Sequence, residues 1–439
     1  MGSHTLAIRA SAVHCTGDPL TDGPEACEYL DDAWLVVEDG EIASLSPASD
    51  AAPGTDDTLD RRGMLLCPGF VDCHVHYPQV DVIASHGERL LEWLERYTFP
   101  AEARFADPAH AADAARFFLD RLLEAGTTTA LVFATVHEAS VDAFFAEADA
   151  RRLRMLCGKV LMDRNAPEAL VEPVDLAESR TRRLIRDWHG RGRLGYALTP
   201  RFAPTSTDAA LAMAGRVVAG HDGTGGALHV HTHLAENAEE CRWVGELFPD
   251  DPDYLGVYER HGLVGPRSVF AHGIHLDDGS WARLGRAGAA VAHCPTSNLF
   301  IGSGLFDLGA ADRAGVAVGL GTDVGGGDSF SLARTVNEAY KVAQLSGGAL
   351  SPERALYLAT LGGARALDLG DRIGSLEPGK EADVLLLDPR ATPLLARRTG
   401  IARDWRERLF ALLMLGDERA VAETRVLGEL ARTGPSRAA

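Results

Sequence analysis

The feature that most constrains the fold is a regular alternation of short apolar, β-rich runs with amphipathic helical stretches between Leu65 and Gly321. The eight apolar runs are Val71–His76, Thr128–Thr135, Met155–Met162, Leu194–Thr199, Ala227–His233, Val269–His272, Ala289–Cys294 and Val316–Gly321. The stretches between them, such as Asp113–Glu124 and Ala209–Ala219, carry apolar residues at helical spacing and stop just before a glycine. Eight repeats of a strand followed by a helix predict an α/β fold, a closed (β/α)8 barrel of the TIM type.

A doubly wound open sheet is the alternative arrangement for such an alternation. That fold places a glycine-rich dinucleotide turn after its first strand. In this chain the first apolar run ends instead in His74 and His76. The closed barrel therefore remains the preferred fold.

The two ends of the chain have a different pattern, with apolar and polar residues alternating as in half-exposed strands. The alternating segments are Leu6–Val13, Ala33–Val37, Glu41–Leu45, Ala382–Leu387 and Val421–Gly428. We expect a small β-sandwich-like domain built from residues 1–66 and 369–439, and a barrel over residues 67–368.

The charge and cysteine content limit the classes of function. Among 439 residues, 63 are acidic and 43 basic, which gives a formal net charge of −20 and opposes binding to nucleic acid or an anionic membrane surface. The seven cysteines are scattered without a CxxC pair, so neither a disulfide framework nor a thiolate zinc site is expected. No apolar stretch reaches the ~18 residues of a membrane span. We expect a cytoplasmic protein, a homodimer, that acts on a small molecule.

In a (β/α)8 barrel the catalytic side chains come from the C-terminal ends of the strands. Four of the eight predicted strands end in residues that can bind a metal ion or transfer a proton. These residues are His74 and His76 on the first strand, His233 and Glu236 after the fifth, His272 on the sixth and Asp323 after the eighth. Their convergence at one mouth of the barrel predicts a hydrolytic metal site.

Three imidazoles and one carboxylate can hold a divalent ion and leave one position for water, whose pKa falls to about 7 when it is bound to zinc. The predicted ligands are His74, His76, His233 and Asp323. Residues two apart on a strand point to the same side, so the first two arrive together. We expect one Zn²⁺ per chain, with Fe²⁺ as the alternative.

The fifth strand offers three histidines on one face, namely His229, His231 and His233. We choose His233 as the ligand because it lies nearest the strand end, three residues before Glu236. His229 and His231 are expected deeper in the barrel as core histidines.

Glu236 is the expected proton shuttle, because it follows the fifth strand on a loop within reach of the same water. The alternative for Glu236 is a solvated carboxylate at a helix N-terminus. Asp323 can serve both as a ligand and as the acceptor of the water's proton. For His272 the favoured role is a hydrogen bond to the attacking water, and the alternatives are a direct ligand or a core histidine.

Beyond these single residues, whole blocks of the sequence resemble the amidohydrolase superfamily and, within it, the guanine deaminases. The blocks are Pro68–Gln79, Leu91–Leu94, Tyr97–Pro100, Thr199–Phe202, His231–Asn237, Cys294–Asn298 and Gly321–Asp323. The resemblance implies zinc-dependent hydrolysis of the C2 amino group of guanine to give xanthine and ammonia. Water then attacks C2 while Glu236 protonates N3.

The resemblance also places Gln79, Arg201 and Phe202 around the purine. Arg201 can donate to a carbonyl oxygen such as O6, Gln79 can contact a ring edge, and Phe202 offers a face for stacking. Trp93 is expected to line the same pocket, with helix packing as the alternative. Glu236 completes the set of expected substrate contacts.

Two other functions remain open at this point. The first is a related aminohydrolase that acts on another aminopurine, a pterin or a triazine. The second is a catalytically inactive barrel that serves as a binding protein. A cyclic-amide hydrolase is less favoured, because its binuclear site usually needs a lysine near the fourth strand, which here ends in Thr199, Pro200 and Arg201.

Overall fold

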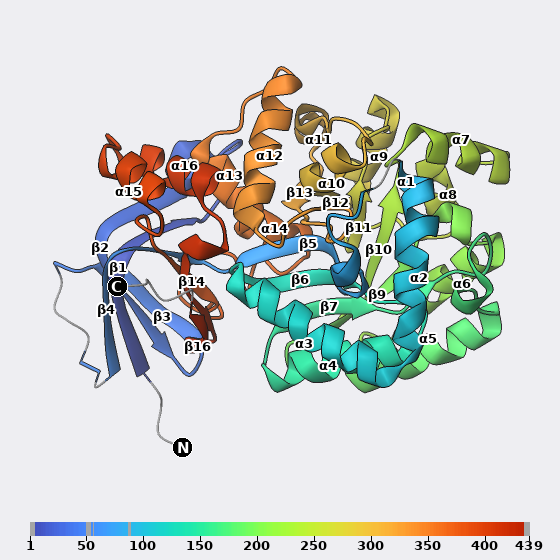
Figure 1. Cartoon of the computed structure of the whole chain (residues 1–439), viewed down its shortest axis with the longest axis horizontal. Helices are drawn as coiled ribbons and strands as arrows, with labels where there is room; N and C mark the ends of the chain where they lie inside the picture. The colour runs from blue at the N-terminus through green and yellow to red at the C-terminus, as the bar shows by residue number, and fades with distance from the viewer. Residues whose placement is uncertain (1–4, 50–53, 56, 87–88, 434–439) are drawn as a thin grey trace.

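The computed structural model describes residues 5–49, 54–55, 57–86 and 89–433. Two sheets organise the chain, a parallel barrel and a mixed sheet that lies beside it (Figure 1). The mixed sheet is built from segments near both termini, which carry the two end colours in Figure 1. This is the architecture that the sequence predicts, and the fold class is confirmed.

The barrel strands follow one another in chain order, and each pairs in parallel with its neighbours. They are β5 (Phe70–His76), β6 (Thr127–Phe133), β7 (Arg154–Gly158), β9 (Gly195–Pro200), β10 (His229–Leu234), β11 (Ser268–His272), β12 (Ala290–His293) and β13 (Ala317–Leu320), with the short β8 (Val160–Leu161) paired to β9. All eight correspond to the predicted runs. Their residues are almost all buried, as expected for strands covered on both faces.

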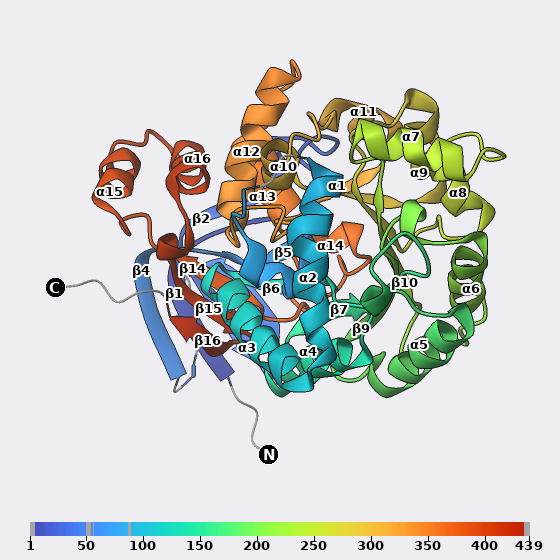
Figure 2. The ribbon, with the colours of Figure 1, turned by 45° about the vertical axis from the view of Figure 1, so that its right-hand side comes forward.

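Helices surround the barrel and extend beyond it. The helices that follow barrel strands are α3 (Pro108–Glu124), α4 (Glu138–Ala150), α5 (Val174–Trp188), α6 (Asp208–Ala219), α7 (Ala238–Leu247), α8 (Tyr254–Arg260), α9 (Asp278–Ala287), α10 (Pro295–Phe300), α11 (Leu308–Ala314), α12 (Leu332–Leu345), α13 (Pro352–Ala359) and α14 (Leu361–Ala366). Two short helices, α1 (Leu90–Trp93) and α2 (Phe99–Ala103), lie between β5 and α3 and flank a single turn of π-helix, Leu94–Thr98. Figures 1 and 2 both show α1 and α2 across the C-terminal ends of the strands.

The barrel closes where the segment after β13 meets β5. The N–H of Asp323 donates to the carbonyl of His74 at 2.9 Å, and the N–H of His76 donates to the carbonyl of Val324 at 3.0 Å. The buried carboxylate of Asp72 accepts a further bond from the N–H of Thr322 at 3.1 Å. Closure of the barrel therefore lies at the same place as the predicted metal ligands.

The interior of the barrel is filled by small and branched side chains, as in other barrels of this size. They include Val71, Cys73, Leu131, Leu156, Ala197, Val269, Ala290, Ala292 and Cys294, which pack with Ala364, Ala366 and Leu367 at the end of α14. His229 donates from Nε2 to the carbonyl of Leu367, at 2.9 Å. It is a core histidine, as predicted.

The mixed sheet has the strand order β16-β15-β14-β4-β1-β2-β3. Its strands are β1 (Thr5–Cys15), β2 (Cys27–Glu38), β3 (Glu41–Pro47), β4 (Asp57–Pro68), β14 (Val384–Leu387), β15 (Val421–Val426) and β16 (Glu429–Thr433). The alternating pattern in the sequence did not predict β4 or β16. It also missed two helices near the C-terminus, α15 (Pro393–Gly400) and α16 (Trp405–Leu415), which lie beside this sheet in Figures 1 and 2. The exact domain limits stay a prediction.

One expectation about the cysteines was wrong. The structure joins Cys15 to Cys27 by a disulfide, although no disulfide was expected. The physical reason is the antiparallel pairing of β1 with β2, which sets these two residues directly opposite each other with their Cα atoms 3.9 Å apart. The other five cysteines are free.

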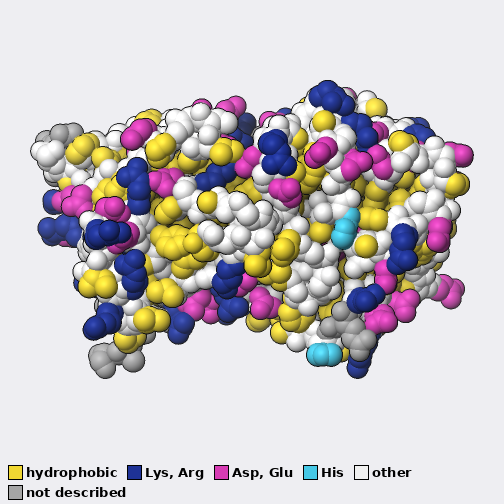
Figure 3. Space-filling model, turned by 90° about the horizontal axis from the view of Figure 1, so that it is seen from above, with side chains coloured by type: hydrophobic (Ala, Val, Ile, Leu, Met, Phe, Trp, Pro, Cys, Tyr) yellow, Lys and Arg dark blue, Asp and Glu magenta, His cyan; other side chains and the backbone are white. Residues whose placement is uncertain are grey.

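On the face shown in Figure 3, side chains of one charge do not form a single large patch. Acidic and basic side chains are interspersed there with apolar ones (Figure 3). Among the described residues, no helix combines the length and apolar character that crossing a membrane requires.

The closure of the barrel leaves no room for a side chain at Gly319 on β13. A Cβ there would meet the Sγ of Cys73 on β5 and would lie 3.0 Å from the Cα of Gly363 on α14. We expect Gly319→Ala to lower the free energy of unfolding by about 1–3 kcal/mol, through overpacking. Urea denaturation measures this change.

The matched control is Gly245→Ala. Gly245 lies exposed within α7, and a Cβ there would meet nothing within 4 Å. Because alanine favours the helix, this variant should be more stable by about 0.5–1 kcal/mol. Equal effects of the two substitutions would contradict the packing argument.

Candidate active site

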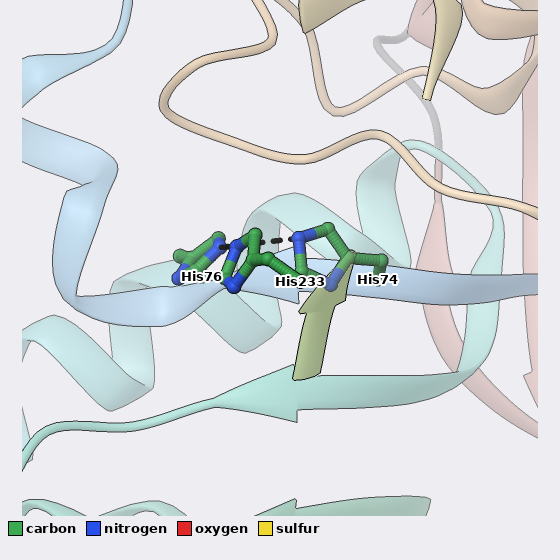
Figure 4. Close-up of side chains that lie close together, drawn as sticks. All are labelled: His74, His76 and His233. Atoms are coloured by element: carbon green, nitrogen blue, oxygen red, sulfur yellow. Dashed lines mark hydrogen bonds between the residues drawn. The ribbon is translucent and has the colours of Figure 1, made fainter. Parts of the chain in front are cut away.

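Four side chains converge at the C-terminal mouth of the barrel. His74 and His76 project from β5 and His233 from β10, and Figure 4 shows their rings together. The Nε2 atom of His76 lies 3.2 Å from that of His74 and 3.3 Å from that of His233. The Oδ1 atom of Asp323 lies 3.2 Å from Nε2 of His74 and 3.3 Å from Nε2 of His76.

These spacings fit a single metal ion. Two ligands about 2.1 Å from a tetrahedral zinc ion lie roughly 3.4 Å apart, close to the distances between these nitrogen and oxygen atoms. Three imidazoles with one carboxylate are also a donor set that zinc accepts in catalytic sites. Two overlapping sets of side chains can hold a divalent ion: His74, His76 and His233 form one, and His74, His272 and Asp323 form the other. Together they contain the four ligands chosen from the sequence, and His272 as well.

The protonation states suit metal binding as well. Burial lowers the pKa of His76 to about 3, so its ring is neutral. Burial alone would raise the pKa of Asp323, but the nearby imidazoles of His74 and His76 outweigh it and hold that pKa well below its usual range. Neutral imidazoles and an ionised carboxylate are the forms that bind metal ions.

Hydrogen bonds on the far side of two rings fix their orientation. Nδ1 of His74 lies 2.8 Å from Nε2 of His231, and Nδ1 of His233 lies 2.7 Å from the carbonyl oxygen of Arg201. Such bonds direct the opposite ring nitrogen towards the metal position. The geometry thus supports His233 as the ligand on β10 and gives His231 a contact to a ligand, which the sequence did not predict.

Glu236 follows β10 and is only 3% exposed. The alternative of a solvated carboxylate is therefore wrong. Burial, together with the charge of Asp323, raises the pKa of Glu236 to about 8, so that it can carry a proton near neutral pH. The hydroxyl of Ser303 donates to its Oε1 at 3.2 Å, and the carboxylate of Glu240 accepts from its backbone N–H at 3.0 Å.

His272 ends β11 and faces both acids of the site. Its Nε2 lies 3.4 Å from Oε2 of Glu236 and 3.8 Å from Oδ2 of Asp323, and it has no hydrogen-bond partner among the described residues. Its Nδ1 lies 2.8 Å from Oδ1 of Asn298, a residue that orients the ring and that the sequence analysis did not single out as functional. This position is open to either a water contact or direct ligation, so the predicted role stays a prediction.

A cavity adjoins these groups at the mouth of the barrel. All five predicted substrate contacts line it, namely Gln79, Trp93, Arg201, Phe202 and Glu236. The apolar side chains of Leu90, Leu94 and Ile301 form part of its wall. The site is therefore a largely apolar pocket with a few polar groups directed into it.

One buried acid near the cavity had no signal in the sequence. Glu102, on α2, is fully buried and contacts both Arg201 and Gln79. A lone glutamate in a short helix resembles a surface residue, so only the fold reveals its place.

Comparison with known proteins settles the family. A model of the amidohydrolase family matches residues 65–426. The chain belongs to the amidohydrolase family. Within the family it is 46% identical to the guanine deaminase of Escherichia coli strain K12 over 98% of both chains. It is 44% identical to the probable guanine deaminase of Deinococcus radiodurans over 93% of this chain and 94% of that one. The predicted resemblance is confirmed.

Solved amidohydrolase structures agree with this placement. Escherichia coli guanine deaminase superposes with a TM-score of 0.93 at 43% identity, covering 98% of this chain and 100% of that one. The guanine deaminase of Clostridium acetobutylicum, solved with guanine bound in its active site, gives a TM-score of 0.87 at 28% identity and covers 97% and 100%. A zinc-bound adenosine deaminase from Xanthomonas campestris gives 0.85 at 26% identity, covering 98% and 93%.

The ligand geometry predicts the outcome of two histidine substitutions on β10. The purified chain should hold about one divalent ion. His233→Ala removes a donor, so it should lose the ion. His231→Ala removes only the contact to His74, so it should keep the ion with affinity weakened roughly 10- to 100-fold. Elemental analysis after dialysis against graded chelator measures both effects. A metal-free His231→Ala beside a metal-loaded His233→Ala would overturn the assignment.

Proposed function

We propose that this chain hydrolyses guanine to xanthine and ammonia, with one zinc ion as its cofactor. The observation that carries the proposal is a single cavity in which His76, His233 and Asp323 of the donor set lie with Arg201, Gln79 and the buried acid Glu236. The high identity to guanine deaminases over nearly the whole chain supports guanine as the substrate.

The zinc ion would be held by His74, His76, His233 and Asp323. When bound, zinc lowers the pKa of a coordinated water to about 7 and so supplies a nucleophile at neutral pH. The zinc found in the related adenosine deaminase supports this choice of ion.

The polar groups of the cavity suit the edges of a guanine ring. Arg201 donates to O6, and Gln79 contacts the neighbouring edge of the ring. Phe202 and Trp93 line the same cavity and provide aromatic surface for the ring faces. Together these four residues hold C2 of the ring next to the metal ligands. The substrate therefore loses most of its orientational freedom on binding, before the reaction begins.

Glu236 carries the proton transfers. Its protonated carboxyl donates to N3 of the ring as water attacks C2, and it then assists the departure of the amino group as ammonia. The ionised Asp323 accepts a proton from the attacking water, and His272 orients that water. Overall, one guanine and one water give one xanthine and one ammonia.

The similarity to bacterial guanine deaminases is in keeping with a cytoplasmic location, and we also propose a homodimeric state. Light scattering on the purified protein measures the oligomeric state directly.

Ammonia release from guanine tests the function. The metal-loaded chain should release ammonia from guanine, lose this activity on chelation and regain it with zinc. Guanine should be preferred to adenine by about 10⁴-fold or more in kcat/KM, because adenine places a donor opposite Arg201 and leaves buried polar groups unpaired. Equal turnover of the two purines, or a preference for a pterin or triazine, would reassign the substrate. Metal binding without any ammonia release would favour the inactive binding barrel.

Glu236→Gln tests the proton shuttle. The substitution keeps the shape of the side chain and the metal ligands but removes the transferable proton, so kcat should fall by roughly 10² to 10⁴ while metal content persists. The matched control is Glu246→Gln on the exposed side of α7, which should leave kcat unchanged. Near-normal turnover by Glu236→Gln would mean that another group carries the proton.

A further inference from the structure

Two of the proposed purine contacts share one partner behind the cavity wall. Glu102 lies on α2, its side chain is fully buried, and it does not itself line the cavity. Its carboxylate contacts the guanidinium of Arg201 and the amide of Gln79. Any effect of Glu102 on a ligand must therefore pass through these two residues.

The guanidinium of Arg201 is held at one end. Its Nη1 donates to both carboxylate oxygens of Glu102, at 2.9 and 2.8 Å. The same group lies over the ring of Phe99, 5.4 Å from its centroid, and Phe99 belongs to the same short helix. With Nη1 engaged, the remaining N–H groups of Arg201 are the donors left for a ligand in the cavity.

The amide of Gln79 is fixed by two groups of opposite kind. Its Nε2 donates to Oε1 of Glu102 at 3.2 Å, and its Oε1 accepts from the N–H of Gly325 at 3.2 Å. A carboxylate only accepts and a backbone N–H only donates, so the reversed amide would lose both bonds. Glu102 and Gly325 together therefore turn the nitrogen of Gln79, and not its oxygen, towards the carboxylate that also binds Arg201.

We propose that Glu102 is a positioning residue that makes the cavity select a purine with an oxygen at C6, by holding Arg201 and Gln79 as neighbouring N–H donors. This inference rests on the proposed function. Two adjacent donors match the acceptor oxygen of an oxopurine, and they oppose the amino group of an aminopurine.

A purely structural role for Glu102 makes a different prediction. As a mere counter-charge for a buried arginine, it would stabilise the fold without affecting which purine is preferred. The ratio of two substrates that differ only at C6 separates the two roles. Guanine and 2,6-diaminopurine form such a pair, since both carry the C2 amino group that is released.

The experiment compares kcat/KM for these two purines in the zinc-loaded wild type and in Glu102→Gln. The variant amide can donate as well as accept, so only the N–H of Gly325 still favours the original orientation of the Gln79 amide. We expect kcat/KM for guanine to fall at least tenfold, chiefly through KM, and the preference for guanine over 2,6-diaminopurine to fall at least tenfold. Metal content should not change. An equal loss for both purines, or an unchanged preference, would overturn the inference.

The control is Glu353→Gln. Glu353 is also a buried glutamate paired with an arginine, Arg406, but it lies on α13, away from the cavity. This variant should keep the wild-type preference. If Glu102→Gln does not fold, Glu102→Asp replaces it. The shorter acid keeps the charge beside Arg201 but withdraws from Gln79, so the preference should still fall, and a wild-type preference would contradict the inference.

A double variant adds a measurement that does not depend on activity. Arg201→Met leaves Glu102 buried without its counter-charge, which should lower the melting temperature. Adding Glu102→Gln removes that charge and should restore part of the loss. The second substitution should not lower the preference for guanine over 2,6-diaminopurine any further, because Arg201→Met has already removed the donor to the oxygen at C6. Independent, additive effects of the two substitutions would contradict coupling between the residues.

Different results would contradict the proposed function and the role of Glu102. A wild-type chain that releases no ammonia from guanine would contradict the proposed function itself. A wild type that deaminates guanine, with a Glu102→Gln variant that keeps the wild-type preference, would contradict this inference alone.

Discussion

The closure of the barrel is the constraint on which the rest of the structure depends. Two backbone hydrogen bonds, from Asp323 to His74 and from His76 to Val324, join the segment after the last strand to the first. Three of the four residues that make these bonds, His74, His76 and Asp323, are also proposed metal ligands. A change that opened this seam would therefore disturb the fold and the metal site together, and metal binding across it would stabilise the closed barrel.

The chain turns sharply where strands deliver functional groups. Ala235, His272 and Asp323 adopt the left-handed backbone conformation, with φ of 49°, 74° and 50°. For residues other than glycine such conformations cost about 1–3 kcal/mol each, and they persist where the surroundings hold them in place. Here the surroundings are the closing bonds, the contact of His272 with Asn298 and the bonds around Glu236. Three of the nine non-glycine residues with positive φ in the described part of the chain thus lie at the mouth of the barrel.

Several polar side chains of the site have a hydrogen bond to a second, buried residue. These groups are held by a buried partner as follows: His74 by His231, Glu236 by Ser303 and Glu240, and Arg201 by Glu102. In a site of low polarity an unpaired charge or donor is costly, so these partners restrict the inner residues to few orientations. The same restriction gives a rigid pocket that can discriminate between similar rings.

Periodicity in the sequence was sufficient to predict the eight barrel strands, because each strand and helix leaves a local pattern of apolar residues. The strand ends then identified His74, His76, His233, His272 and Asp323, since the ends of parallel strands meet at one mouth of a barrel. Partners that are distant in sequence left no such pattern. Glu102 reads as an ordinary helical glutamate, β4 as part of a polar segment, and Cys15 and Cys27 as unrelated thiols. Only the tertiary structure decides these contacts, because each depends on which surfaces the folded chain brings together rather than on the residues next to it in sequence.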